Sequence, residues 1–101
     1  MFRSKGGNIM IFNDEFKILA DHYGFTSQAN MLCEEAAEFT VALNKLRRGN
    51  NEAYKNVKEE LADVLVVALQ LRLLLGPEEI DRIAEEKVNR QLRRIESEEQ
   101  E

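Results

Sequence analysis

Residues 51–75 read NEAYKNVKEELADVLVVALQLRLLL, and their apolar side chains recur at intervals of three and four residues. This spacing places one continuous apolar stripe on a single side of an α-helix. The stripe consists of Tyr54, Val57, Leu61, Val64, Ala68, Leu71 and Leu75. From Val64 onward the segment is apolar nearly all round, so we expect that half to be buried on several sides. A long helix with a buried face is therefore predicted over these residues.

The rest of the chain shows the same periodicity, interrupted by three glycines at Gly24, Gly49 and Gly76. Glycine favours the position just past the end of a helix. The apolar spacing predicts further helices over residues 13–23 and 27–48 and from Pro77 onward. Because no strand pattern competes, we predict an all-α fold. It is expected to be four-helix bundle-like, with the two long central helices in an antiparallel hairpin about Gly49.

Length and composition indicate one small folded domain. Of the 101 residues, 44% are hydrophobic and 33% are charged, and the chain has one proline. We assign a mobile leader to residues 1–12, a single all-α domain to residues 13–96 and an acidic tail to residues 97–101. A fold of this size buries only about 65% of the surface of its unfolded chain, so an oligomer is a reasonable expectation.

Charge and hydropathy exclude several classes of protein. The net charge of −5 disfavours binding to a nucleic acid polymer. The single cysteine, Cys33, rules out an intrachain disulfide and the usual zinc clusters. The longest apolar run, residues 64–69, is far shorter than the roughly 20 residues that span a bilayer, and no signal-peptide pattern follows Met1. We therefore expect a reduced, soluble, cytoplasmic protein without a membrane partner.

Two of the predicted helices carry acidic pairs at mirrored positions. Glu35 and Glu38 share one helix face because residues three apart lie on the same side, and Glu60 and Asp63 do so on the next helix. Glu38 lies eleven residues before Gly49, and Glu60 lies eleven residues after it. Glu35 and Asp63 each lie fourteen residues away. In an antiparallel hairpin the four acids are thus expected at matching heights, about 16 to 21 Å from the turn.

Converging carboxylates in a partly buried site would repel one another, so they would take up protons or bind a cation. Ligation by oxygen alone suits Mg²⁺ or Mn²⁺, with waters and substrate phosphates completing the octahedron. The stripe through Glu60 and Asp63 continues as Val67, Gln70 and Leu74, whose burial would turn the acids inward. The alternative is a solvated, glutamate-rich helix surface, which is a common feature of soluble helices.

The last predicted helix carries a basic stripe. Lys87, Arg90 and Arg94 are spaced three and four residues apart, and Asn89 stands between them in the chain. Such a stripe suits a polyphosphate whose remaining oxygens are held by a metal. The alternative is that these side chains interact with the helix dipole and pair with neighbouring glutamates.

The acidic motif resembles that of a known enzyme family. It reads Glu34-Glu35-x-x-Glu38, then a spacer of 21 residues, then Glu60-x-x-Asp63. This is similar to the motif of the all-α nucleoside triphosphate pyrophosphohydrolases, the MazG-like enzymes, whose relatives include phosphoribosyl-ATP pyrophosphohydrolases and dimeric dUTPases. The similarity covers about residues 13–95, and residues 87–94 look like the basic phosphate-contacting stretch of the family.

This resemblance implies a Mg²⁺-dependent hydrolase, with Mn²⁺ as a substitute, that cleaves nucleoside or deoxynucleoside triphosphates, modified ones included. Cleavage between the α and β phosphates would give a nucleoside monophosphate and pyrophosphate in a house-cleaning role. Glu34 would orient or deprotonate the attacking water. The metal ligands would be Glu35, Glu38, Glu60 and Asp63, and the phosphate-binding residues would be Lys87, Asn89, Arg90 and Arg94.

The resemblance also implies a homodimer or homotetramer with the nucleotide bound between subunits. Two alternatives remain open from the sequence. One is a phosphoribosyl-ATP pyrophosphohydrolase-like enzyme, in which the metal would have the same role. The other is a non-catalytic helical oligomerisation module, in which the acids would form only a charged face.

Overall fold

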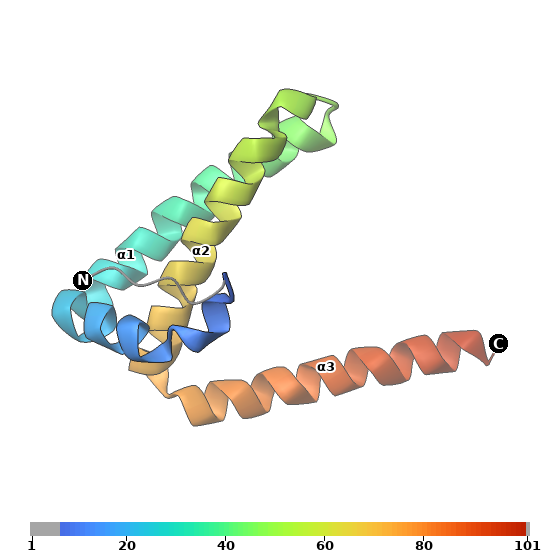
Figure 1. Ribbon diagram of the computed structural model, residues 1–101. Helices are drawn as coiled ribbons and strands as arrows, with labels where there is room; N and C mark the ends of the chain where they lie inside the picture. Colours follow the sequence, from blue (N-terminus) through green and yellow to red (C-terminus); the bar gives the residue numbers. More distant parts are fainter. Residues whose placement is uncertain (1–6, 101) are drawn as a thin grey trace.

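The computed structural model describes residues 7–100, and the elements within them are all helical (Figure 1). In chain order they are the 3₁₀ turn η1 (Ile9–Ile11), α1 (Asn13–Arg47), the 3₁₀ turn η2 (Asn51–Ala53), α2 (Tyr54–Leu75) and α3 (Pro77–Glu99). The predicted all-α class is confirmed. Residues 1–6 of the predicted leader and residue 101 of the predicted tail lie outside the described residues. None of the described helices is long and apolar enough to cross a membrane.

The first two predicted helices are the two parts of α1, which is kinked at Gly24, so the predicted break at this glycine is confirmed. The backbone of Gly24 has φ 83° and ψ 171°, a conformation that a side chain would strain and that glycine adopts freely. In Figure 1 the part of α1 before the bend runs in a different direction from the part after it. Phe16 and Ala20, both before the bend, are buried, so this first part of α1 contributes to the core.

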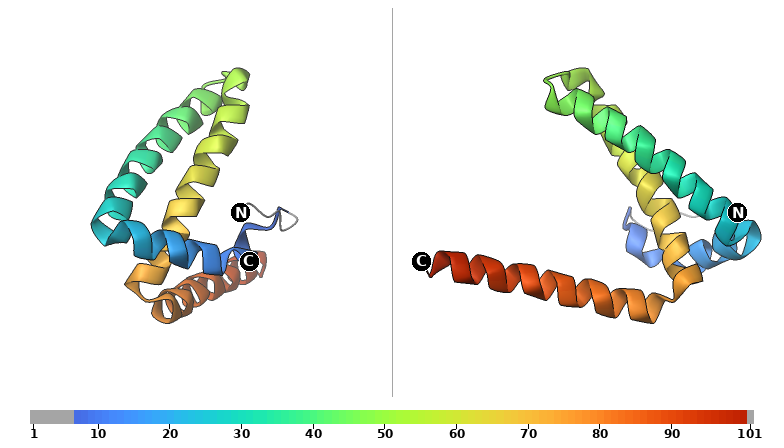
Figure 2. Two further views of the ribbon diagram at one scale, coloured as in Figure 1. Left: turned by 60° about the vertical axis from the view of Figure 1, so that its left-hand side comes forward. Right: turned by 180° about the vertical axis from the view of Figure 1, so that it is seen from behind.

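The remainder of α1 and the whole of α2 run antiparallel on the two sides of Gly49 (Figures 1 and 2). Their register is shown by a hydrogen bond in which Gln28 Nε2 donates to Gln70 Oε1 at 2.6 Å. Gln28 lies twenty-one residues before Gly49, and Gln70 lies twenty-one residues after it. Residues equidistant from Gly49 are therefore level with each other in the hairpin.

The buried face of α2 lies between the two stripes named from the sequence. Val67 and Gln70, of the stripe that begins with Glu60, are buried. Leu71 of the apolar stripe is buried as well, whereas Leu61 of that stripe is 41% exposed. Because much of α2 is apolar nearly all round, periodicity alone does not decide which of two adjacent stripes faces α1. The predicted burial of Val67 and Gln70 is confirmed, so the stripe that begins with Glu60 turns toward the inner side of the hairpin.

The direction of α3 is set at its junction with α2. Gly76 has φ 110°, in the left-handed region, and ends α2. Across this turn the guanidinium of Arg72 holds the carboxylate of Asp81 through two hydrogen bonds, one from Nε to Oδ1 at 2.6 Å and one to Oδ2. This hydrogen bonding from Arg72 lowers the pKa of Asp81. Two-point contact of this kind fixes orientation as well as distance.

Beyond this junction α3 extends away from the hairpin instead of packing along it (Figures 1 and 2). Residues 81–100 are all exposed, including apolar Val88, Leu92 and Ile95. The four-helix bundle is therefore not completed within one chain. The radius of gyration is 16.7 Å, compared with about 13 Å for a compact domain of 100 residues.

Candidate metal centre

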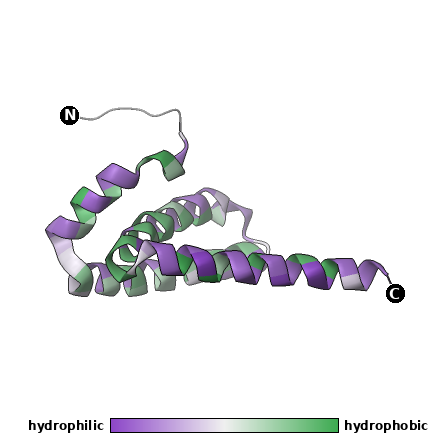
Figure 3. Cartoon of the chain, turned by 90° about the horizontal axis from the view of Figure 1, so that it is seen from below, coloured by the Kyte–Doolittle hydropathy of each residue, from purple (hydrophilic) through white to green (hydrophobic). Residues whose placement is uncertain are grey.

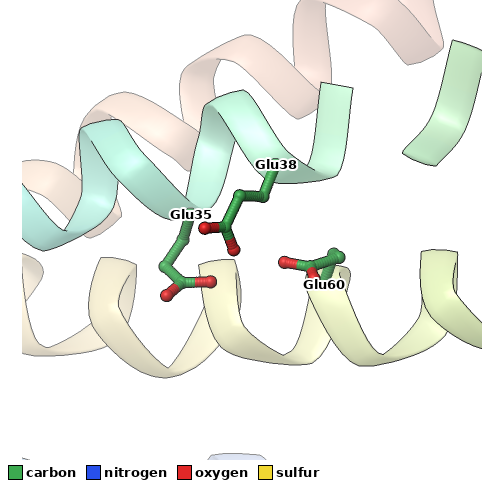
Figure 4. A group of neighbouring side chains, drawn as sticks. All are labelled: Glu35, Glu38 and Glu60. Carbon is green, nitrogen blue, oxygen red and sulfur yellow. The ribbon is translucent and has the colours of Figure 1, made fainter. Parts of the chain in front are cut away.

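The hairpin gathers carboxylates from α1 and α2 between the two helices. Glu35 and Glu38 come from α1 and Glu60 comes from α2, and each offers an oxygen within 4.8 Å of the oxygens of the other two. Figure 4 shows the three side chains pointing toward one another across the space between the ribbons. The mirrored spacing about Gly49 thus brings acids from separate helices into one group, which we call the acidic cluster.

Two oxygens of the acidic cluster are buried and have no hydrogen-bond partner among the described residues. They are Glu35 Oε2 and Glu60 Oε2, one from each helix. A buried polar atom without a partner is costly, and for a carboxylate oxygen the cost is greatest when the group is ionised. A cation held between α1 and α2 would satisfy both oxygens, so the residues fit a metal ligand set.

The electrostatics of the acidic cluster favour either a proton or a cation. Burial raises the pKa of Glu35, and repulsion from the neighbouring carboxylates of Asp63 and Glu38 raises it further. Burial likewise raises the pKa of Glu60, with repulsion from Glu38 and Glu35 adding to it. Each of these groups thus resists ionisation because of burial first and the neighbouring charges second, and a divalent cation would favour the ionised forms.

The size of the acidic cluster suits a small hard cation. Mg²⁺ binds oxygen at about 2.0 to 2.1 Å, so two of its ligands lie no more than about 4.2 Å apart. The three oxygens lie within 4.8 Å of one another, near enough to share one such cation once the glutamate side chains draw in around it. Carboxylate oxygens are also the donors that Mg²⁺ and Mn²⁺ prefer.

The other two acids of the motif lie at the edge of the acidic cluster. Asp63 is exposed and lies close enough to Glu35 for the two carboxyls to share a hydrogen bond when one is protonated. It is not among the three residues whose oxygens are mutually within 4.8 Å. Glu34 is exposed, and its charge makes the smallest of the contributions that raise the pKa of Glu35. Both are therefore open to solvent and to a substrate.

The predicted phosphate-binding residues are not brought to the acidic cluster of their own chain. Lys87, Asn89, Arg90 and Arg94 lie exposed along α3, which leads away from the hairpin. Within residues 7–100 none of the three cations forms an ion pair, although the neighbouring Arg82 pairs with Glu86 at 3.0 Å. The ion pairs with nearby glutamates that the alternative interpretation expects are thus not found among the described residues.

The raised pKa values predict how stability depends on pH. A group whose pKa is higher in the folded state stabilises the fold below its unfolded pKa and loses that contribution as pH rises through the folded value. We expect the Tm in chelator to fall as pH rises from about 4.5, the ordinary glutamate value, through the raised values of Glu35 and Glu60. Saturating Mg²⁺ should raise the Tm most at neutral pH. Thermal melts across this range check it, and a Tm that responds to neither pH nor Mg²⁺ would contradict it.

One family of known proteins matches most of the chain. The family model of the MazG nucleotide pyrophosphohydrolase domain matches residues 24–97. This range contains the whole acidic cluster, both helices of the hairpin after the bend, and most of α3. No curated protein and no solved structure gives a match. Since the family match covers well over half of the chain, the protein belongs to the MazG nucleotide pyrophosphohydrolase domain family.

Proposed function

We propose that this protein is a Mg²⁺-dependent nucleoside triphosphate pyrophosphohydrolase. The reaction adds water across the bond between the α and β phosphates and releases a nucleoside monophosphate and pyrophosphate. The observation that supports it best is the pair of buried carboxylate oxygens, Glu35 Oε2 and Glu60 Oε2, that lack a partner between α1 and α2. Their place inside the region matched by the family model supports the same reaction class.

The exposure of each acidic side chain of the hairpin suggests its role in the reaction. Glu35, Glu38 and Glu60, with Asp63 at the edge, would hold the metal. The chemistry that Mg²⁺ supplies when bound is neutralisation of the charge that develops at phosphorus and on the leaving pyrophosphate. Glu34 is exposed one residue away from Glu35, so it would accept a proton from the attacking water and orient it.

The substrate phosphates would be bound by α3 of a second copy of the chain. Lys87, Asn89, Arg90 and Arg94 cannot serve the hairpin they follow while α3 points away from it, and the apolar residues on α3 are exposed. In Figure 3 hydrophobic segments recur along α3 between hydrophilic ones. The accessible surface of 8087 Å² exceeds by about 2,000 Å² that of a compact monomer of this mass. A stable interface buries about 800 Å² per partner, so a homodimer or homotetramer fits this surface.

The products of the reaction test this function directly. With nucleoside triphosphates and Mg²⁺ we expect monophosphate and pyrophosphate in equal amounts, without a diphosphate intermediate. A panel of nucleotides, analysed by ion-exchange chromatography with a separate assay for orthophosphate, makes the measurement. Addition of chelator should abolish the release. Orthophosphate as the first product would mean attack at the γ phosphate and would contradict the proposal, as would a complete lack of turnover across the panel.

A further inference from the structure

Two glutamines form a buried link between the helices of the hairpin. Gln28 is 6% exposed and Gln70 is 2% exposed, and the amide of Gln28 donates to Gln70 Oε1 at 2.6 Å. Gln28 Oε1 accepts from Ser27 Oγ at 3.3 Å, and Gln70 Nε2 donates to the carbonyl of Val66 at 3.1 Å. Apart from contacts between carboxyls of the acidic motif, this is the one side-chain hydrogen bond between α1 and α2 within residues 7–100.

Such a link is a poor means of gaining stability. Burying two amides removes them from water, and the net contribution of a hydrogen bond between them is small. A well-packed apolar pair would stabilise the core as well or better. A buried polar pair instead supplies specificity, because only one axial register and one rotation of the two helices satisfies both partners.

The glutamines lie on the same faces as the acidic cluster. Gln28 precedes Glu35 by seven residues, and Gln70 follows Asp63 by seven residues. A seven-residue step is about two helical turns and about 10.5 Å, and it returns nearly to the same side of the helix. A contact that fixes how Gln28 faces Gln70 therefore also fixes how Glu35 faces α2.

The acidic cluster needs such a constraint because its own charges oppose it. Repulsion between the carboxylates of α1 and α2 favours separation or rotation of the helices when no cation is bound. At one end the helices are joined by the short connection of residues 48–53. At the other end the first side-chain hydrogen bond between them is that of Gln28 with Gln70, so the acidic cluster lies between two fixed points.

We propose that Gln28 and Gln70 are a positioning pair that holds the carboxylates of α1 and α2 level and facing each other for the metal. Neither glutamine is a metal ligand or touches the substrate; they act through the orientation of the helices. This inference rests on the metal site of the proposed function. It goes beyond that function by assigning a role to two residues outside the acidic motif.

The test replaces both glutamines with leucine, Gln28→Leu with Gln70→Leu. The double variant should fold with a Tm in chelator at least as high as that of the wild type, because an apolar pair replaces a buried polar one. Its Kd for Mn²⁺, measured by calorimetry, should rise about tenfold, and kcat should fall by a similar factor, since small misplacement of a site is costly. Leu71→Met, a change of similar volume at another buried position of α2, is the matched control and should leave both values unchanged.

A distance measurement keeps the inference testable without metal. Cysteines are introduced at exposed positions 40 and 58, which are level in the hairpin, in a Cys33→Ser background. They are labelled with nitroxides, and the labelled protein is diluted with unlabelled protein. In chelator the label distances should be longer or more broadly distributed in the double leucine variant than in the labelled protein with both glutamines. Equal distance distributions, or an unchanged Mn²⁺ Kd and kcat, would overturn the positioning role. A wild-type protein that binds no Mn²⁺ would overturn the proposed function instead, and the label distances would still decide the role of the glutamines.

Discussion

Changing Glu60 to glutamine is expected to reduce pyrophosphate release by at least about 100-fold, because an amide cannot supply the negative charge that holds the metal. Glu60 is the clearest choice, since its Oε2 is buried without a partner on the α2 side of the acidic cluster. The measurement is steady-state turnover of a nucleoside triphosphate at saturating Mg²⁺, with circular dichroism to verify native helix content.

The same variant should be more stable than the wild type when metal is absent. The raised pKa of Glu60, caused first by burial and then by repulsion from Glu38 and Glu35, means that its ionised form opposes folding. Glutamine resembles the protonated form of glutamate, so the Tm of the variant in chelator at neutral pH should be higher than that of the wild type. Addition of Mg²⁺ should then no longer raise the Tm. Glu59→Gln is the matched control, because Glu59 is exposed beside Lys55 and outside the acidic cluster. Full turnover in Glu60→Gln, or equal losses in both variants, would contradict the site.

Mixing two impaired variants is expected to restore activity above that of either one if α3 of one copy serves the hairpin of another. Arg90→Ala should lower kcat/KM by about 10- to 100-fold, the value of one charge-assisted hydrogen bond to phosphate. A mixed oligomer of Glu60→Gln with Arg90→Ala contains sites with an intact acidic cluster from one copy and an intact α3 from the other. Random assembly of equal amounts gives about one quarter of wild-type sites.

The complementation is measured by refolding the two variants together and assaying at low substrate concentration. Each variant refolded alone supplies the baseline, and a mixture assembled before the assay is compared with one in which the two proteins are kept separate. Arg82→Ala is the control for charge loss on α3, since Arg82 is engaged with Glu86. If the mixture gives only the mean of the two separate activities, the basic residues do not act on a neighbouring hairpin.

The hairpin and the heights of the acids could be predicted because they depend on local information. Helical periodicity, the glycine at the turn and equal spacing of Glu38 and Glu60 from Gly49 are all present in the sequence, and the bond between Gln28 and Gln70 shows the same register. The division of α1 at Gly24 could also be predicted, because the backbone of this glycine is not helical. The chain changes direction at Gly24 while the helical pattern continues on both sides.

The buried side of α2 could be predicted in part. Val67 and Gln70, of the stripe that begins with Glu60, are buried as expected, together with Leu71 of the apolar stripe. The direction of α3 could not be predicted in the same way. The direction of α3 depends on the Arg72–Asp81 pair, whose members are nine residues apart on different helices. Seven-residue spacing from Glu35 and Asp63 was the signal that could have indicated the pairing of Gln28 with Gln70.

The most direct test is to locate a bound cation. Crystals grown with Mn²⁺ should show an anomalous difference peak between α1 and α2, within bonding distance of oxygens from Glu35, Glu38 and Glu60, and the peak should vanish in Glu60→Gln. Mn²⁺ is suitable because it accepts the same oxygen ligands as Mg²⁺ and scatters anomalously. A well-ordered hairpin without a peak at the acidic cluster, at Mn²⁺ concentrations that support full turnover, would contradict the assignment of these carboxylates as the metal centre.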